Sequence, residues 1–330
     1  MSVDRVATLG ADIEAGPAAL AALLDAYGAP GGPLEALGER PSMIGCVGLG
    51  SSRYAALAAA AGAWHAGLSA WAEYASAASL PSLPSDGALL AISASGRTRE
   101  VVQLARRRRG LARVIAVTND PASPLAEEAD VVLPLVASAE GAGIATRTFR
   151  ATIAVLALMV GRWTAGAGGT TVRDMRGTVE RLRAVMDGRD AWLPEAAVLL
   201  DRATSIDVLG DATDAALTSQ AALMLREAPR IPAVAHDTAD WLHTAVYQAW
   251  PGHRALLYAG SAADADVVAA IRRRGGETVV VGSRVEGAAL SIETPPLDRP
   301  FERATVLSVI AELLSLELWS RTTAEEVALR

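Results

Sequence analysis

Short apolar runs that alternate with longer stretches of helical periodicity constrain the fold of this chain more than any other feature. Aliphatic runs without polar alternation are typical of strands buried on both faces, and such strands occur in parallel sheets joined by helices. The first half of the sequence therefore predicts a βαβ series. Its strand candidates are 43–50, 87–93, 112–118 and 130–135, and its helix candidates are 52–72, 97–109 and 148–164.

The second half repeats this plan. The triplet "ALL" at 88–90 recurs at 255–257, and an arginine-rich stretch closes the following helix in both halves. We therefore expect an α/β protein with two αβα sandwich domains, each with a parallel sheet flanked by helices. The domains are placed at 1–165 and 172–330, joined by the glycine-rich "TAGAGGTT" (164–171). The strand candidates here are 205–210, 253–260 and 277–283, with helices near 213–228, 263–274 and 303–320.

Composition argues against several classes of partner. The formal net charge of −7 disfavours nucleic acid or an anionic membrane as the main partner. The longest apolar run, "ATIAVLALMVG" (151–161), is too short to span a bilayer, and the acidic N-terminus lacks a signal-peptide pattern. Cys46 is the only cysteine, which favours the cytoplasm. All 30 basic residues are arginine, so no lysine can form a Schiff base, and nothing in the sequence indicates a cofactor.

Hydroxyl residues and glycines crowd the predicted exits of two neighbouring strands. In an open parallel sheet, ligands collect at the carboxyl ends of the strands, where the next helix presents free N–H groups and the positive end of its dipole. The two loops together predict a phosphate site without lysine, although each alone matches ordinary turn and N-cap residues. The residues are Gly50, Ser51 and Ser52 after one strand, and Ser93, Ser95, Gly96 and Thr98 after the other.

Four motifs resemble, in order and spacing, the sugar isomerase (SIS) domain: "GLGSS", "ISASGRTREVV", "VIAVTNDPASPLAEEADVVLPL" and "EGAGIATRTF". The resemblance is to the tandem-SIS isomerase part of glucosamine-6-phosphate synthase and its deaminase and deglycase relatives. It extends to "ADIEAGPAALAALL" (11–24), which looks like the entry helix of that family. The resemblance implies a set of residues that hold a sugar phosphate and a pair near the sugar hydroxyls. These are Ser52, Ser93, Ser95 and Thr98 for the phosphate, and Ser51 and Thr146 for the hydroxyls.

The repeat predicts a single phosphate site in each chain. The loop of the second half that corresponds to 93–98 is "AGSAADAD" (259–266), which has one serine and two aspartates. Carboxylates at this position would repel phosphate. We therefore expect the first domain alone to hold the sugar phosphate.

The resemblance also assigns a catalytic segment, "LTSQAALMLREAPRIPAVAHDTADWLH" (217–243). Glu227 matches the carboxylate that moves a proton between sugar C1 and C2, and His243 matches the histidine that opens the sugar ring. A carboxylate base and an imidazole acid suit these steps. In the family this histidine can come from the partner subunit, which implies a homodimer with a shared active site. Taken alone, Glu227 also fits a solvated charge near a helix end, and His243 fits a core histidine.

The sequence departs from the synthase pattern on the predicted catalytic helix. Gln220, Met224 and Glu227 share one helical face by their spacing. Met224 stands where the pattern has a catalytic lysine, and Gln220 replaces a glutamate. Glu140, in a strand-exit loop, is a further acid or base candidate. No histidine spacing indicates a metal site, so none is expected.

Two functions remain open from the sequence. One is an enzyme for a phosphorylated sugar or amino sugar that performs isomerisation, deamination or C–N cleavage through ring opening and C1–C2 proton transfer. The other is a non-catalytic phosphosugar-binding or regulatory protein that has lost the catalytic lysines. Retention of both Glu227 and His243 favours the enzyme, because a binding protein needs neither.

Overall fold

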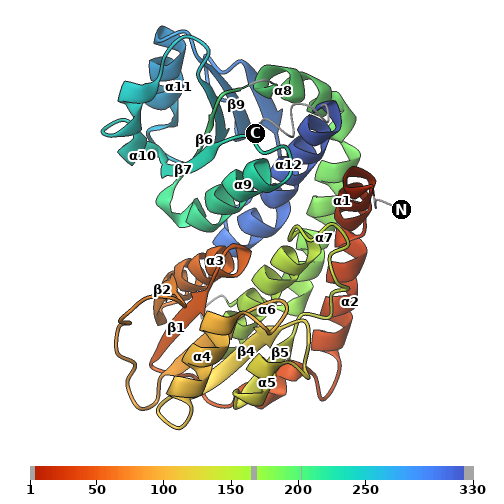
Figure 1. Ribbon diagram of the computed structural model, residues 1–330, viewed down its shortest axis with the longest axis vertical. Helices are drawn as coiled ribbons and strands as arrows, with labels where there is room; N and C mark the ends of the chain where they lie inside the picture. Colours follow the sequence, from red (N-terminus) through yellow and green to blue (C-terminus); the bar gives the residue numbers. More distant parts are fainter. Residues whose placement is uncertain (1–3, 165–168, 202, 323–330) are drawn as a thin grey trace. The chain divides into compact units, whose positions relative to one another are not determined.

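The computed structural model describes residues 4–164, 169–201 and 203–322. It contains two parallel sheets of five strands, each flanked by helices (Figure 1), so the predicted α/β architecture is confirmed. The chain divides into two compact units. Glu14–Glu180 and Arg299–Thr305 form the A unit, and the remaining described residues form the B unit. Of the predicted linker, 165–168 lie outside the described residues, and the domain boundaries stay a prediction.

The A unit is built on a sheet with the strand order β2-β1-β3-β4-β5, in which all neighbours are parallel. Its strands are β1 (Met43–Gly48), β2 (Ser69–Tyr74), β3 (Ala88–Ile92), β4 (Arg113–Thr118) and β5 (Val131–Pro134). Its helices are α2 (Gly16–Gly28), α3 (Ser51–His65), α4 (Arg99–Arg108), α5 (Pro124–Glu127) and α6 (Arg147–Trp163), with the 3₁₀ helix η1 at Pro33–Leu37.

Strand alternation divides the core of the A unit between the two faces of its sheet. Leu89 and Val114 pack with Val101 of α4 and Leu125 of α5 in one buried cluster. Because successive side chains of a strand point to opposite faces, Leu90 and its neighbours on the adjacent strands are directed to the other face. Helix α3 packs there against α6, which is buried along most of its length. Both faces are therefore covered, as the continuous apolar runs predict.

The B unit has the strand order β10-β9-β8-β6-β7. Counted from the first strand of each unit, both sheets follow the order 2-1-3-4-5, with the first and third strands adjacent. The strands are β6 (Ile206–Gly210), β7 (Ala233–Asp237), β8 (Arg254–Tyr258), β9 (Glu277–Gly282) and β10 (Leu290–Glu293). The helices that lie wholly within this unit are α8 (Leu193–Leu200), α9 (Ala215–Glu227), α10 (Thr238–Trp241) and α11 (Asp264–Arg273), with short 3₁₀ helices η2 (Arg189–Ala191), η3 (Ala212–Asp214) and η4 (Ala245–Gln248).

Three further helices contribute residues to both units by sequence. They are α1 (Arg5–Glu14), α7 (Val172–Asp187) and α12 (Pro300–Arg321). The predicted entry helix at 11–24 is thus two helices, with a break at Ala15 between α1 and α2. Proline at the first turn of α2 accounts for the break, since its ring cannot continue a preceding helix.

The sequence interpretation missed three edge strands. The predicted helix 52–72 is too long, because α3 ends at His65 and β2 begins at Ser69. Strands β7 and β10 were also not anticipated. All three lie at sheet edges, where most residues are partly exposed and the strand lacks a continuous apolar run. A pattern based on two buried faces therefore finds central strands and passes over such edges.

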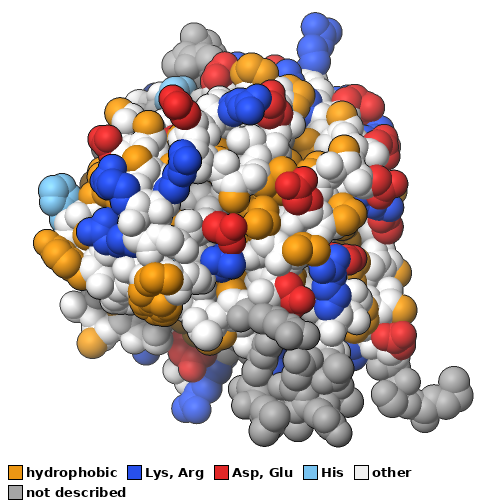
Figure 2. Space-filling view, turned by 90° about the horizontal axis from the view of Figure 1, so that it is seen from above, with side chains coloured by type: hydrophobic (Ala, Val, Ile, Leu, Met, Phe, Trp, Pro, Cys, Tyr) orange, Lys and Arg blue, Asp and Glu red, His pale blue; other side chains and the backbone are white. Residues whose placement is uncertain are grey.

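Acidic and basic side chains both occur over the face shown in Figure 2, with apolar side chains between them. Among the residues that the structure describes, no single helix is long and apolar enough to cross a membrane, and only α1 and α2 taken together reach that length and composition.

Candidate functional site

A cavity of about 570 Å³ opens in the A unit at the carboxyl edge of its sheet. Its walls come from the loops that follow β1, β3, β4 and β5 and from the start of α6. The cavity lies where β1 and β3 are neighbours and the strand order reverses, which is the usual ligand position in doubly wound sheets. Six predicted residues line it: Ser51, Ser52, Ser93, Ser95, Thr98 and Glu140.

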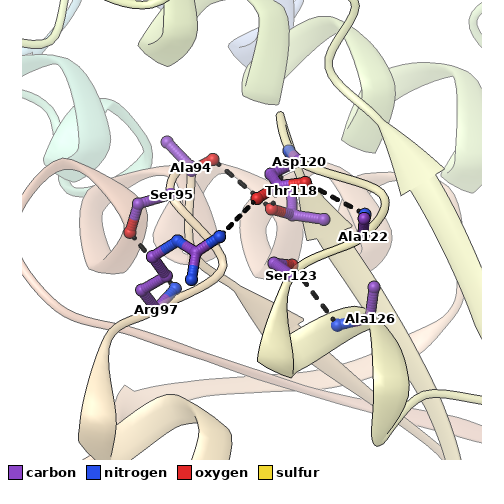
Figure 3. Close-up of polar contacts among 8 residues, drawn as sticks. All are labelled: Ala94, Ser95, Arg97, Thr118, Asp120, Ala122, Ser123 and Ala126. Atoms are coloured by element: carbon purple, nitrogen blue, oxygen red, sulfur yellow. Dashed lines mark hydrogen bonds and ion pairs between the residues drawn. The ribbon is translucent and has the colours of Figure 1, made fainter.

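The β3–α4 loop presents hydroxyl groups beside a helix N-terminus. Ser93 is buried, and its Oγ lies 2.9 Å from Thr98 Oγ1. Ser95 is exposed, and its Oγ accepts a hydrogen bond from the Arg97 N–H at 3.2 Å (Figure 3). Gly96 has φ +64°, and a Cβ at this position would collide with the Ser123 side chain. Only glycine therefore allows this turn to pack against the β4–α5 loop.

The β1–α3 loop forms the adjoining wall. Gly50, with φ +54°, precedes α3, and Ser51 and Ser52 start the helix. The N-cap residue of α3, Gly50, has no side chain, and the N-cap residue of α4, Thr98, makes no side-chain capping hydrogen bond. The first-turn N–H groups of both helices therefore lack a side-chain acceptor from their cap residues, and an anion can take that place.

Helix α6 is capped by Glu140. The Glu140 carboxylate accepts hydrogen bonds from the Thr146 and Thr148 N–H groups at 2.9 and 2.8 Å, and from their hydroxyls at 3.1 and 3.0 Å. Arg147 Nε lies 3.5 Å from the same carboxylate. Glu140 thus borders the cavity and fills the N-terminus of α6. The fully buried Thr146 is turned to Glu140 and is not among the cavity-lining residues.

Several lining residues were not among the predicted site residues. Asn119 and Asp120 follow β4, and Thr148, Phe149 and Thr152 lie on the first two turns of α6. A signal was present for the threonines, since they stand four residues apart just before and at the start of the long apolar run of the helix and so share a face. Asp120 follows a predicted strand exit in the same way as the serines do.

The loop after β8 in the B unit corresponds to the β3–α4 loop of the A unit, and its N–H groups bind a carboxylate of the chain itself. After β8, the Gly260 and Ser261 N–H groups donate to Asp264 Oδ2 at 2.7 and 3.1 Å. Asp264 is buried and is the first residue of α11. After β6, Asp211 Oδ1 accepts from the Thr213 N–H at 2.9 Å. The exit loop of β8 therefore already holds an anionic group.

The predicted catalytic residues lie in the B unit, and the cavity lies in the A unit. On α9, Gln220 and Met224 are buried, whereas Glu227 is exposed at the last turn. Partial desolvation raises the pKa of the Glu227 carboxyl, and the neighbouring Arg226 guanidinium opposes this. His243 is exposed two residues past α10, and its backbone N–H donates to the Asp240 carbonyl at 2.9 Å.

A buried carboxylate anchors the segment that carries His243. Asp207 Oδ2 accepts a hydrogen bond from the Trp241 indole at 2.7 Å, which ties α10 to β6. The imidazoles of His236 and His253 lie 3.5 and 3.3 Å from the same carboxylate. Burial raises the pKa of the Asp207 carboxyl, but the two imidazoles and the indole lower it more, so that it lies well below its usual range. Within the described parts of the chain, no group of three potential ligands is arranged to hold a metal.

The comparison with known protein families gives a match within the A unit. The family model of the SIS domain matches residues 44–162, which include every residue that lines the cavity. The glutamine–fructose-6-phosphate aminotransferase (isomerizing) of Aeropyrum pernix is 32% identical over 217 residues, which cover 63% of this chain and 34% of that protein. The chain thus spans about a third of the length of this curated relative.

Solved structures resemble the whole chain in fold. The C-terminal domain of glucosamine-fructose-6-phosphate aminotransferase from Francisella tularensis has a TM-score of 0.81 at 17% identity, with 95% of each chain covered. Glucosamine-6-phosphate deaminase from Thermotoga maritima has a TM-score of 0.75 at 18% identity, with 95% of this chain and 94% of that chain covered. At these identities the likeness shows an SIS-like α/β fold.

The low pKa of Asp207 predicts a specific pH dependence of stability. A carboxyl whose pKa is lowered by folding stabilises the protein above its unfolded pKa of about 3.9, and this contribution disappears as the pH falls toward the folded value. The stability difference between wild type and Asp207→Asn should therefore shrink by up to about 1.4 kcal/mol for each pH unit below about 4. Urea unfolding followed by tryptophan fluorescence measures it, and parallel curves for the two proteins would contradict the prediction.

Asp264 should contribute more to the free energy of unfolding than an exposed aspartate of the same helix does. Asp264→Ala deprives the Gly260 and Ser261 N–H groups of their carboxylate acceptor, which should lower the free energy of unfolding by about 1–3 kcal/mol. Asp266→Ala is the matched control, because Asp266 is exposed in the same first turn. Equal losses for the two variants in urea unfolding would show that the loop does not depend on this carboxylate.

Proposed function

We propose that the chain binds a phosphorylated sugar or amino sugar in the A-unit cavity and acts on it as a sugar-phosphate isomerase or a related C–N-cleaving enzyme. One observation carries the binding: two helix N-termini without side-chain caps meet at the strand-order reversal, where Ser51, Ser52, Ser93 and Thr98 line one cavity. Free N–H groups and hydroxyls at such a point suit a phosphate. The relatives named above, which act on fructose 6-phosphate or glucosamine 6-phosphate by name, support this ligand class.

The proposed reaction uses two groups of the B unit. Glu227 is the base that moves a proton between C1 and C2, and its raised pKa suits a carboxylate that must accept a proton near neutrality. His243 assists ring opening, and its exposure leaves the imidazole accessible. An enediol route needs only a base and an acid, so the absence of lysine from the chain is compatible with it.

The same proposal includes a tandem pair of SIS domains and a cytoplasmic homodimer. The shared 2-1-3-4-5 strand order of the two sheets supports the tandem pair. Tyr247 and Trp250, which follow His243 closely in sequence, are large apolar side chains with 82% and 47% exposure. Exposed aromatic residues of this size are typical of association surfaces, which supports a second copy near the His243 segment.

A binding-only function is the second candidate, and the burial of Met224 favours it. At the position where the resembling family has a catalytic lysine, the side chain here is fully buried in the core of the B unit. Gln220 is buried in the same way. Because Met224 and Gln220 are buried in the core, neither side chain is placed to contact a substrate. This suits a protein that only holds its ligand.

The phosphate-binding role predicts a large effect of two hydroxyls. Ser93→Ala combined with Ser95→Ala should weaken binding of fructose 6-phosphate or glucosamine 6-phosphate about 100-fold or more, since each hydrogen bond to a charged group contributes about 1.5–3 kcal/mol. Isothermal titration calorimetry measures the affinity. Ser261→Ala, at the equivalent loop of the B unit, is the control and should bind as wild type does. Unchanged affinity of the double variant would refute the assignment of this loop.

Proton exchange separates the enzyme from the binding protein. In D₂O, wild type should introduce deuterium at C1 or C2 of a hexose or hexosamine 6-phosphate, detected by NMR. Glu227→Gln should slow this exchange at least 100-fold, within the range of about 10²–10⁴ for general bases. Glu195→Gln, an exposed carboxylate of α8, should leave the rate unchanged. Tight binding without exchange for any sugar phosphate would exclude the enzyme and leave the binding function.

A further inference from the structure

An ion pair joins the phosphate-binding loop to a carboxylate in the cavity wall. Asp120 lines the cavity from the β4–α5 loop. Arg97 lies in the β3–α4 loop and is not itself among the lining residues. Its Nη2 lies 3.0 Å from Asp120 Oδ2, and Figure 3 shows the guanidinium turned toward that carboxylate. The pair thus joins a residue of the phosphate-binding loop, outside the cavity lining, to a negative charge on the cavity surface.

The two loops are held together without this ion pair. The Asn119 N–H donates to the Ala94 carbonyl at 2.9 Å, and the Leu125 N–H donates to the Gly96 carbonyl at 3.0 Å. Thr118 Oγ1 also donates to the Ala94 carbonyl, at 3.3 Å. These bonds are made by backbone groups and a buried threonine, so the loops remain joined if the ion pair is removed.

The carboxylate of Asp120 also has its own support. Its Oδ1 accepts a hydrogen bond from the Ala122 N–H at 3.0 Å, and its backbone N–H donates to Thr118 Oγ1 at 3.2 Å (Figure 3). The side chains of Arg97 and Asp120 are 63% and 38% exposed, and ion pairs this exposed contribute only about 0–1 kcal/mol to stability. The main consequence of the pair is therefore electrostatic and not structural.

The electrostatic effect of Arg97 is important because the cavity wall carries negative charge and no positive side chain among its described residues. The described residues that line the cavity include two carboxylates, Asp120 and Glu140, and no arginine or histidine. Glu140 is matched by Arg147 and by the donors at the start of α6. Asp120 depends on Arg97 for its neutralisation, since the hydrogen bond that its carboxylate accepts from the Ala122 N–H brings no charge. Without Arg97, a phosphate would face a bare negative charge in the same cavity.

We propose that Arg97 sets the affinity of the cavity for sugar phosphates by neutralising Asp120, which makes Arg97 a positioning residue that acts through that carboxylate and does not contact the ligand. The inference rests on the proposed phosphosugar function and adds the way in which the site tolerates a dianionic ligand without a basic residue in its wall. In this proposal, the Asp120 carboxylate repels the phosphate only when Arg97 is absent.

A charge-rescue experiment tests the proposal. Binding of fructose 6-phosphate and glucosamine 6-phosphate is measured by calorimetry for wild type, Arg97→Gln, Asp120→Asn and the double variant. Arg97→Gln should weaken binding about tenfold, as expected for one partly screened charge near a phosphate. Asp120→Asn should bind as tightly as wild type or more tightly, and the double variant should return to the wild-type affinity. The deficit of Arg97→Gln should shrink in high salt, because salt screens the exposed carboxylate.

Alternative roles of the pair give different patterns. If Arg97 contacts the phosphate directly, the double variant stays as weak as Arg97→Gln. If the ion pair acts as a structural link, Asp120→Asn weakens binding as much as Arg97→Gln does, and adding it does not restore affinity. Either pattern, or unchanged binding in Arg97→Gln, overturns the proposal. Arg107→Gln, on an exposed turn of α4, controls for net charge and should bind as wild type does. Wild-type protein that binds neither sugar phosphate contradicts the proposed function and the inference with it.

Discussion

The free N–H groups at helix N-termini are the constraint on which this structure depends. Each βα unit of a parallel sheet delivers such groups to the carboxyl edge, where they need an acceptor. The chain supplies an acceptor at some of these positions and not at others. Glu140 and Asp264 supply a carboxylate from the chain itself to α6 and to the loop before α11. The starts of α3 and α4 receive no side-chain acceptor from their cap residues. The cavity lies where those two helices begin.

The central strands and the phosphate-binding loops could be predicted from the sequence, because both depend on local composition. Continuous apolar runs mark strands with two buried faces, and clustered serines at their exits mark the loops. The edge strand β2 could not be recognised in the same way, because its residues are partly exposed. The signal that α3 ends before it was a single glycine, Gly67, which has φ +69°. Glu140 was expected as an acid or base, but its four hydrogen bonds to the start of α6 depend on the fold. The ion pair of Arg97 could not be predicted from the sequence, because its partner, Asp120, belongs to a different loop.

The B unit shows how burial changes the reading of a helix. Periodicity places Gln220, Met224 and Glu227 on one face, yet the first two are core residues and only the last reaches solvent at the helix end. The exposed His243 follows a helix that is tied to β6 by the bond between Trp241 and Asp207. On α9 the exposed carboxylate thus lies at the helix end, while the middle of the helix packs into the core.

Asp264 gives the loop after β8 a different role from that of the equivalent loop in the A unit. A carboxylate that is part of the chain is present at the loop at all times and cannot be diluted, so a free anion competes with it at a permanent disadvantage. A loop whose N–H groups are satisfied in this way is a structural element whose ligand is encoded in the gene. Two units with the same strand order can therefore differ in ligand binding through one side chain, and a single codon then decides whether the second unit can hold a free anion.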